Sequence, residues 1–278
     1  MRVFISADME GITGIATLDD VSRGELDYEQ GRELMHGDVN AAIEGTIEGG
    51  AEEVLVNDSH GSMSNLRRAD VDDRARLVRG STKPRRMMAG LSADHDVALF
   101  VGYHAKAGTA GGVLNHTMLG SDLVRLRVNG SEVGELGWNA RLAAQLGVPV
   151  GLVTGDDKTE EEAEAELRDV ETVVVKTGIG RFAADCRPPG ETRPAIRAAA
   201  ARTVERAASG GFEQSLAVET PVRIEADWVT THHAAGAALQ PGVERVDGRT
   251  TAVEQRTYEA VYEAAVAMIL AGARSTPD

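Results

Sequence analysis

The chain has 278 residues, a net charge of −15 and only 4% aromatic residues. This length suffices for one large α/β domain or two smaller ones with a buried core. A strongly acidic chain repels phosphate backbones and a chain poor in aromatic residues offers few stacking surfaces, so DNA and RNA are not expected as partners.

The first hundred residues predict apolar strands that alternate with helices. The strands are expected at residues 3–7, 53–57, 76–78 and 96–103. Apolar residues recur at helical spacing over 28–46, which predicts a helix, and a shorter helix is expected at 84–91. Because the third long strand is almost entirely apolar, we expect both faces of its sheet to be buried.

A β-hairpin is predicted in the middle of the chain. Apolar and polar residues alternate over 123–133, and Asn129–Gly130 is a strong signal for a tight hairpin turn. Beyond it the pattern predicts, in order, a helix at 135–146, a strand at 148–154, a helix at 160–167 and a strand at 172–176. We expect Gly178–Gly180 to interrupt this series.

Pro188–Gly190 is the best candidate for a boundary in the sequence. The segments after it predict a helix at 193–208, a strand at 220–226 and a final helix at 251–271. The fold class is therefore expected to be α/β, a mostly parallel sheet with flanking helices, an inserted β-hairpin and a smaller C-terminal α+β part. Residues 1–187 would form the metal-binding catalytic part, and residues 188–278 would pack on it.

Three of the predicted strands end in residues that bind metals. Asp8 and Glu10 follow the first strand, His60 follows the second, and His104 ends the strand at 96–103. The carboxyl ends of parallel strands line one crevice, so these four side chains are expected to converge. Two carboxylates and two imidazoles suit Zn²⁺, with Mn²⁺ or Co²⁺ as alternatives. The pattern predicts hydrolysis by a metal-activated water.

Further candidates lie close by in the sequence. His116 follows a glycine-rich loop, where it could donate a hydrogen bond to an oxyanion or shuttle a proton; a third metal ligand and a core histidine are the alternatives. Glu135 begins a predicted helix, which suits either a metal ligand or an ordinary first-turn acid. Asp156 and Asp157 follow another strand and are expected to lie just outside the ligand set.

Three groups are set aside. His232–His233 are adjacent on a predicted helix and so point apart. Asp58–His60 are consecutive and cannot line up as a catalytic triad, so Asp58 is expected to support the turn. Cys186 lies in a predicted loop, which argues against a nucleophile, and a lone cysteine fits a reducing compartment. No apolar run approaches a membrane span and no signal peptide follows Met1, so a cytoplasmic location away from membranes is expected.

Several motifs recur in one order through roughly the first 155 residues. They are Ser6–Gly11, Val56–His60, Gly102–His104, Asn115–His116, Val133–Gly137 and Gly155–Asp157. Together they resemble the zinc-dependent D-aminopeptidase family, the D-alanyl dipeptide transport-operon type. Several separate blocks in register make the resemblance specific.

This resemblance implies a two-zinc site with His116 beside it. The implied ligands are Asp8, Glu10, His60, His104 and Glu135. We expect Asp8 to bridge the two ions and His116 to stabilise the oxyanion. The substrates would be short peptides or amides with an N-terminal D-residue such as D-Ala. The family also implies a homo-oligomer, a decamer of stacked pentameric rings whose active sites face an inner channel.

Two alternatives remain open at this point. The first is a metal-dependent hydrolase of another bond, such as a phosphoester, although apart from Lys106 few cations are placed to hold a phosphate. The second is a non-catalytic, metal-containing ligand-binding protein.

Overall fold

Two β-sheets organise the chain. The structure, a computed structural model, describes residues 1–212 and 216–274. Its first sheet has the strand order β3-β2-β1-β4-β7-β8-β9, in which neighbours are parallel except for the antiparallel pair β8–β9. The strands are β1 (Arg2–Ala7), β2 (Glu53–Asp58), β3 (Ala75–Val78), β4 (Val97–Val101), β7 (Val150–Asp156), β8 (Glu171–Gly180) and β9 (Ala183–Cys186).

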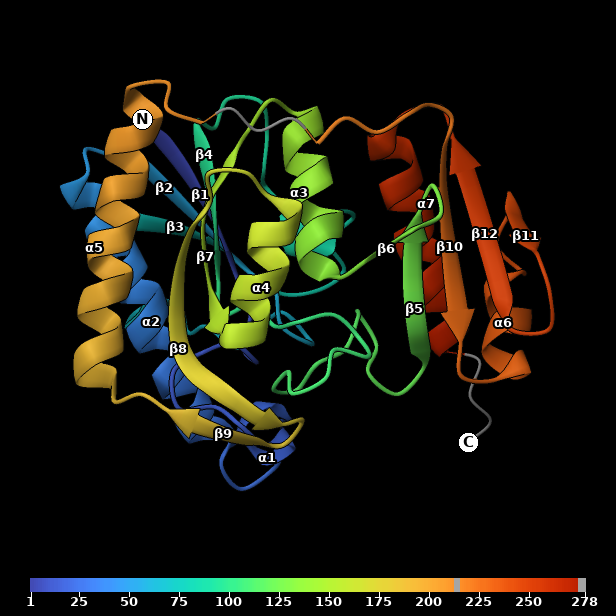
Figure 1. The fold of residues 1–278 in the computed structure, drawn as a ribbon, viewed down its shortest axis with the longest axis horizontal. Coiled ribbons are helices and arrows are strands. Elements are labelled where there is room, and N and C mark those ends of the chain that lie inside the picture. The colour runs from blue at the N-terminus through green and yellow to red at the C-terminus, as the bar shows by residue number, and fades with distance from the viewer. Residues whose placement is uncertain (213–215, 275–278) are drawn as a thin grey trace.

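Helices cover both faces of this sheet (Figure 1). Helices α2 (Tyr28–Glu48) and α5 (Pro189–Ala208) lie on one face, and α3 (Glu135–Gln145) and α4 (Asp157–Glu166) lie on the other. Because both faces are covered, β1 is apolar on both sides: Val3 and Ile5 join the cluster under α2 and α5, whereas Phe4 joins the cluster on the opposite face.

The second sheet is antiparallel and has the order β11-β12-β10-β5-β6. Its strands are β5 (Leu123–Val128), β6 (Ser131–Val133), β10 (Val222–Trp228), β11 (Val243–Arg245) and β12 (Thr250–Gln255). The predicted hairpin forms β5 and β6, and its turn residues Asn129 and Gly130 both have positive φ, 47° and 82°. These observations confirm the predicted fold class, a mostly parallel sheet with flanking helices plus an antiparallel part.

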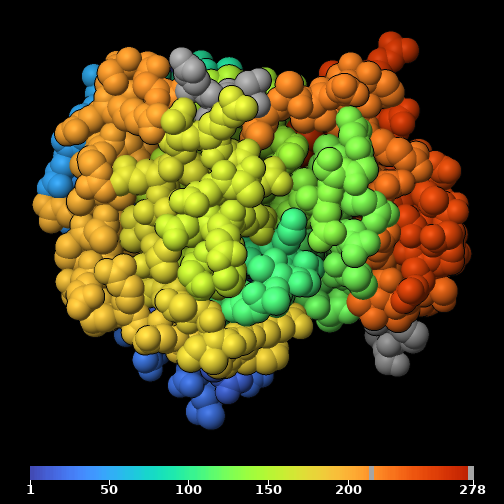
Figure 2. Space-filling view, viewed as in Figure 1, coloured from blue at the N-terminus to red at the C-terminus, as the bar shows by residue number. Residues whose placement is uncertain are grey.

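One apolar cluster joins the two sheets. Helix α7 (Tyr258–Ala273) packs on the second sheet, and its Tyr262 stacks on Trp138 of α3 with ring centroids 4.3 Å apart. Tyr258 donates a hydrogen bond to the carbonyl of Trp138 at 2.9 Å. In Figure 2 the segment that follows β4 fills the surface between α4 and β5. The domain boundary after residue 187 stays a prediction; α5, which follows it, packs on α2.

Some predicted elements were wrong. A helix was predicted to start at residue 251, but residues 250–255 form β12, where Thr251 and Val253 pair with β10. The helix begins at 258, after Thr257 accepts a hydrogen bond from the amide of Ala260 at 3.3 Å. β-Branched residues favour a strand, and threonine is a common N-cap, so the local sequence is consistent with both features.

The other differences are smaller. Gly178–Gly180 does not interrupt the chain, because β8 continues to Gly180 and pairs with β9. Cys186, expected in a loop, ends β9, and it is exposed. The predicted helix at 84–91 is one 3₁₀ turn, Arg86–Met88, and a second such turn spans Arg68–Asp70. The short helices α1 (Leu18–Val21) and α6 (Thr231–Ala237) complete the fold.

None of the helices in residues 1–212 and 216–274 combines the length and apolarity needed to cross a membrane.

Candidate metal centre

The sheet order brings the predicted ligands together. Strand β1 lies between β2 and β4, and all three are parallel. The residues that follow these strands, Asp8 and Glu10, His60, and His104, therefore meet at one edge. Glu135 reaches the same edge from the first turn of α3.

One group of side chains consists of Asp8, Glu10 and His60, whose ligand atoms all lie within 4.8 Å of one another. Nδ1 of His60 lies 2.9 Å from Oε2 of Glu10 and 3.4 Å from Oδ1 of Asp8. Both carboxylates are almost fully buried, 3% and 5% exposed. A buried pair of carboxylates is costly unless a cation or a shared proton compensates it.

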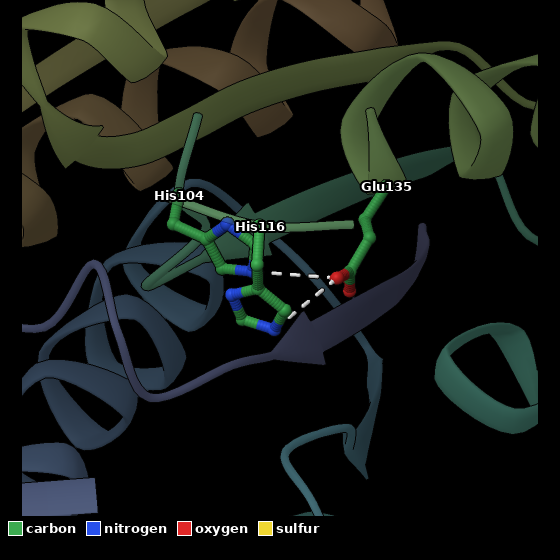
Figure 3. Close-up of side chains that lie close together, drawn as sticks. All are labelled: His104, His116 and Glu135. Carbon is green, nitrogen blue, oxygen red and sulfur yellow. Dashed lines mark ion pairs between the residues drawn. The ribbon is translucent and has the colours of Figure 1, made fainter. Parts of the chain in front are cut away.

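A second group consists of His104, His116 and Glu135, again within 4.8 Å of one another. Figure 3 shows both imidazoles directed at the Glu135 carboxylate. Nε2 of His104 lies 3.4 Å and Nε2 of His116 lies 3.7 Å from Oε1 of Glu135. The two rings are stacked, with centroids 4.1 Å apart. His116, which follows no strand, thus reaches the cluster from the loop between β4 and β5.

Asp8 lies between the two groups. Its Oδ1 is 3.4 Å from Nδ1 of His60, and its Oδ2 is 3.5 Å from Nε2 of His104. Each carboxylate oxygen therefore faces a histidine of a different group. This is the arrangement that a carboxylate shared between two ions requires.

Backbone carbonyls fix the orientation of all three imidazoles. The contacts are His60 Nε2 to the oxygen of Val21 at 2.9 Å, His104 Nδ1 to that of Ala105 at 3.0 Å, and His116 Nδ1 to that of Leu114 at 2.9 Å. Each ring nitrogen in contact with a carbonyl oxygen must carry a hydrogen, because that oxygen can only accept. In a neutral ring the other nitrogen then has a lone pair, and in all three rings this nitrogen faces carboxylate oxygens. A lone pair directed at a carboxylate needs a cation or a proton between them. The donor set, nitrogen and oxygen with oriented rings, therefore fits Zn²⁺.

Without a metal, protons have to compensate the charges of the cluster. Burial raises the pKa of Asp8 to about 7, and the charge of Glu10 adds to this rise. Burial opposes ionisation of Glu10 as well, but the charge of His60 and its hydrogen bond hold the pKa of Glu10 well below its usual value. Burial lowers the pKa of His104, yet Glu135 and Asp8 raise it to about 10. Divalent cations would replace these shared protons.

Asp156 and Asp157, the two aspartates predicted to lie just outside the ligand set, support the surrounding backbone. Asp156 caps α4 by accepting from the amide of Thr159 at 2.7 Å, and it also accepts from the amide of Val113 at 2.7 Å. Asp157 accepts from the amide of Gly178 at 2.7 Å. Asp156 therefore ties the start of α4 to the loop that carries His116.

The other candidates lie apart from the cluster. Asp58 accepts from the side-chain nitrogen of Asn65 and from the amide of Leu66, each at 2.8 Å, which fixes the turn after His60. His233 is buried in α6 beside Trp228, whereas its neighbour His232 is exposed.

Lys176, which was not among the predicted site residues, binds the backbone of the segment that carries Glu10. Its fully buried Nζ donates to the carbonyls of Glu10 at 2.5 Å, Ile12 at 2.9 Å and Ile15 at 2.7 Å. Lys176 lies in the middle of an apolar strand. Because lysine is rarely buried there without partners for its charge, this position is the feature of the sequence that could have identified it.

Replacing Lys176 with methionine should lower the free energy of unfolding by about 2–4 kcal/mol, because three buried carbonyls lose their donor. Lys158→Met is the matched control. The Lys158 amine pairs with Glu161 on the outside of α4, and the change should cost no more than about 0.5 kcal/mol. Denaturant unfolding of both variants measures the difference. Equal stabilities would show that the three carbonyl contacts do not matter for folding.

An open cavity of about 540 Å³ leads to the cluster. We call the part lined by Glu10, His60 and His116 the floor of the cavity. The rest of the lining, which includes residues of the α1 region and of the β8–β9 turn, is its wall. The cavity has room for a small peptide and gives it direct access to Glu10 and His60 of the first group and to His116 of the second.

Comparisons with known proteins agree on one family. A family model described as D-aminopeptidase matches residues 1–267. A D-aminopeptidase of Bacillus subtilis (strain 168) is 36% identical over 251 residues, 90% of each chain. Among solved structures, a zinc-dependent D-aminopeptidase from Bacillus subtilis, described as a self-compartmentalizing protease, superposes with a TM-score of 0.92, 33% identity and complete coverage of both chains.

Proposed function

The chain belongs to the D-aminopeptidase family, and from that premise we propose that it removes N-terminal residues, D-alanine among them, from short peptides or amides with the help of two zinc ions. The observation that carries the proposal is the position of Asp8, with one oxygen toward each half of the cluster.

We assign the cluster as the zinc site. Asp8, Glu10 and His60 would hold one ion. Asp8, His104 and Glu135 would hold the other, because Nε2 of His104 lies 3.5 Å from Asp8 and 3.4 Å from Glu135. Bound zinc supplies a Lewis acid that polarises the scissile carbonyl and lowers the pKa of a water molecule. The zinc-dependent relative of known structure supports the choice of metal.

Within this site, His116 has the position of an oxyanion donor. Its side chain is 18% exposed, against 2% for His104, and it lines the cavity that the substrate would enter. The hydrogen bond from Nδ1 to the carbonyl of Leu114 fixes the ring so that Nε2 faces the cluster. Because Nδ1 already carries a hydrogen, Nε2 donates only when the ring is doubly protonated. That imidazolium would donate to the developing negative charge on the substrate oxygen.

An aminopeptidase has to hold the free amino group of its substrate, and the cavity ends at a cluster that could do so. A peptide that enters it would present its free amino group to the carboxylates and the metals on the floor, and the rest of the peptide would extend along the wall. We further propose a homo-oligomer, decameric as the family resemblance implies, in a cytoplasmic setting. The self-compartmentalizing relative supports self-association.

The experiment is a substrate screen with metal removal. We expect the purified protein to hydrolyse D-alanine amide faster than L-alanine amide. A chelator should abolish the activity and added zinc should restore it. Hydrolysis of p-nitrophenyl phosphate without any amidase activity would instead favour the phosphoesterase alternative.

A further inference from the structure

Arg181 occupies the turn that joins β8 to β9, at the mouth of the cavity. Its carbonyl accepts a hydrogen bond from the amide of Leu114 at 2.7 Å. The carbonyl of Leu114 in turn accepts from Nδ1 of His116 at 2.9 Å. Two consecutive hydrogen bonds thus fix the position of the Arg181 backbone relative to His116.

The side chains of Arg181 and His116 line the same part of the cavity, the hollow beside Gly120. A Cβ atom placed on Gly120 would lie 3.4 Å from Nη2 of Arg181 and 3.5 Å from Cγ of His116. All three residues line the cavity. A molecule that contacts His116 on the floor therefore has the guanidinium within reach as it extends outward.

The guanidinium of Arg181 is available for an anion. In the part of the chain that the structure describes, it forms no ion pair, and it lies over the ring of Phe182 at 5.3 Å. The other arginine of the cavity wall, Arg23, donates instead to the hydroxyl of Ser64 at 2.8 Å. A planar guanidinium binds a carboxylate through two parallel hydrogen bonds, and Phe182 restricts its orientation in advance.

We propose that Arg181 binds the C-terminal carboxylate of a short peptide substrate and so makes the enzyme prefer peptides that end shortly after the scissile bond. The inference rests on the proposed aminopeptidase function. We place the amino group of the peptide at the floor of the cavity and the scissile carbonyl at His116. Each residue beyond that carbonyl extends the chain by about 3.3–3.6 Å. A dipeptide or tripeptide therefore ends in the hollow beside Gly120, whereas a longer peptide would place an uncharged amide there.

The test compares one scissile bond with and without the charge. The substrates are D-Ala-D-Ala and its C-terminal amide. We expect the wild-type enzyme to prefer the free acid, and Arg181→Met to lower kcat/KM for the acid by about tenfold to a hundredfold, mainly through KM. For the amide, kcat/KM should stay within about twofold. Arg181→Lys should recover part of the loss, because it restores the charge without the planar pair of donors.

Arg23→Met is the matched control, because it removes an equal charge from the same cavity. Its effect should be alike on the acid and on the amide. If it reproduces the Arg181→Met result, the positive charge of the cavity as a whole explains the preference for the free acid, and Arg181 is not a specific anchor for the carboxylate. Equal losses on acid and amide in Arg181→Met, or no wild-type preference for the acid, would overturn the anchor alone. A wild-type enzyme that hydrolyses neither peptide would overturn the proposed function and the anchor with it.

Discussion

Replacing Asp8 with asparagine is expected to leave the protein folded but nearly free of zinc and without peptidase activity. Asparagine keeps the size of the side chain and one oxygen, but its NH₂ group cannot bind a metal. Since each Asp8 oxygen faces a different half of the cluster, the substitution weakens both ion sites together. Loss of the metals removes several kcal/mol of transition-state stabilisation, so turnover should fall by roughly 10³-fold or more.

Asp58→Asn is the matched control for this result. Asp58 is also a buried carboxylate at the end of a parallel strand, but it accepts hydrogen bonds from Asn65 and Leu66 instead of facing the histidines. We expect this variant to keep most of its zinc and activity. Elemental analysis and turnover on D-alanine amide compare the two. An Asp8→Asn protein with wild-type metal content would show that Asp8 is not a ligand.

The His116→Ala variant should lose turnover while it keeps its metal. The ring of His116 lies at the cavity and is held by a carbonyl, so its removal deletes a donor to the transition state. An oxyanion donor of this kind is worth about 10²–10³-fold in kcat, with little effect on ground-state binding.

His104→Ala serves as the comparison, because His104 is buried beside both Asp8 and Glu135. We expect that variant to lose metal as well as activity. The two variants should therefore differ in zinc content although both lose most of their activity. If His116→Ala loses metal to the same extent as His104→Ala, then His116 is a ligand and the division of roles is wrong.

The sequence predicted that Asp8, His60 and His104 lie close together, because this proximity depends mainly on the order of three parallel strands. Asp8, His60 and His104 each follow an apolar run, and three parallel neighbours bring such residues to one edge whatever happens elsewhere in the fold. Local patterns also predicted the hairpin at Asn129–Gly130, where the turn chemistry is specific.

Contacts that do not follow from the order of the parallel strands could not be predicted in this way. Lys176 and Glu10 are 166 residues apart, and Arg181 meets the His116 loop only because β8 continues into a hairpin with β9. The misassigned segment at 250–255 has a related cause: it pairs with β10, and this tertiary contact decides its conformation.

The metal content of the purified wild-type protein tests the central claim most directly. The account predicts two zinc ions per chain by elemental analysis after purification without chelators. It also predicts that both are lost when Asp8 is replaced. A single equivalent that does not increase when zinc is added would contradict the two-metal site.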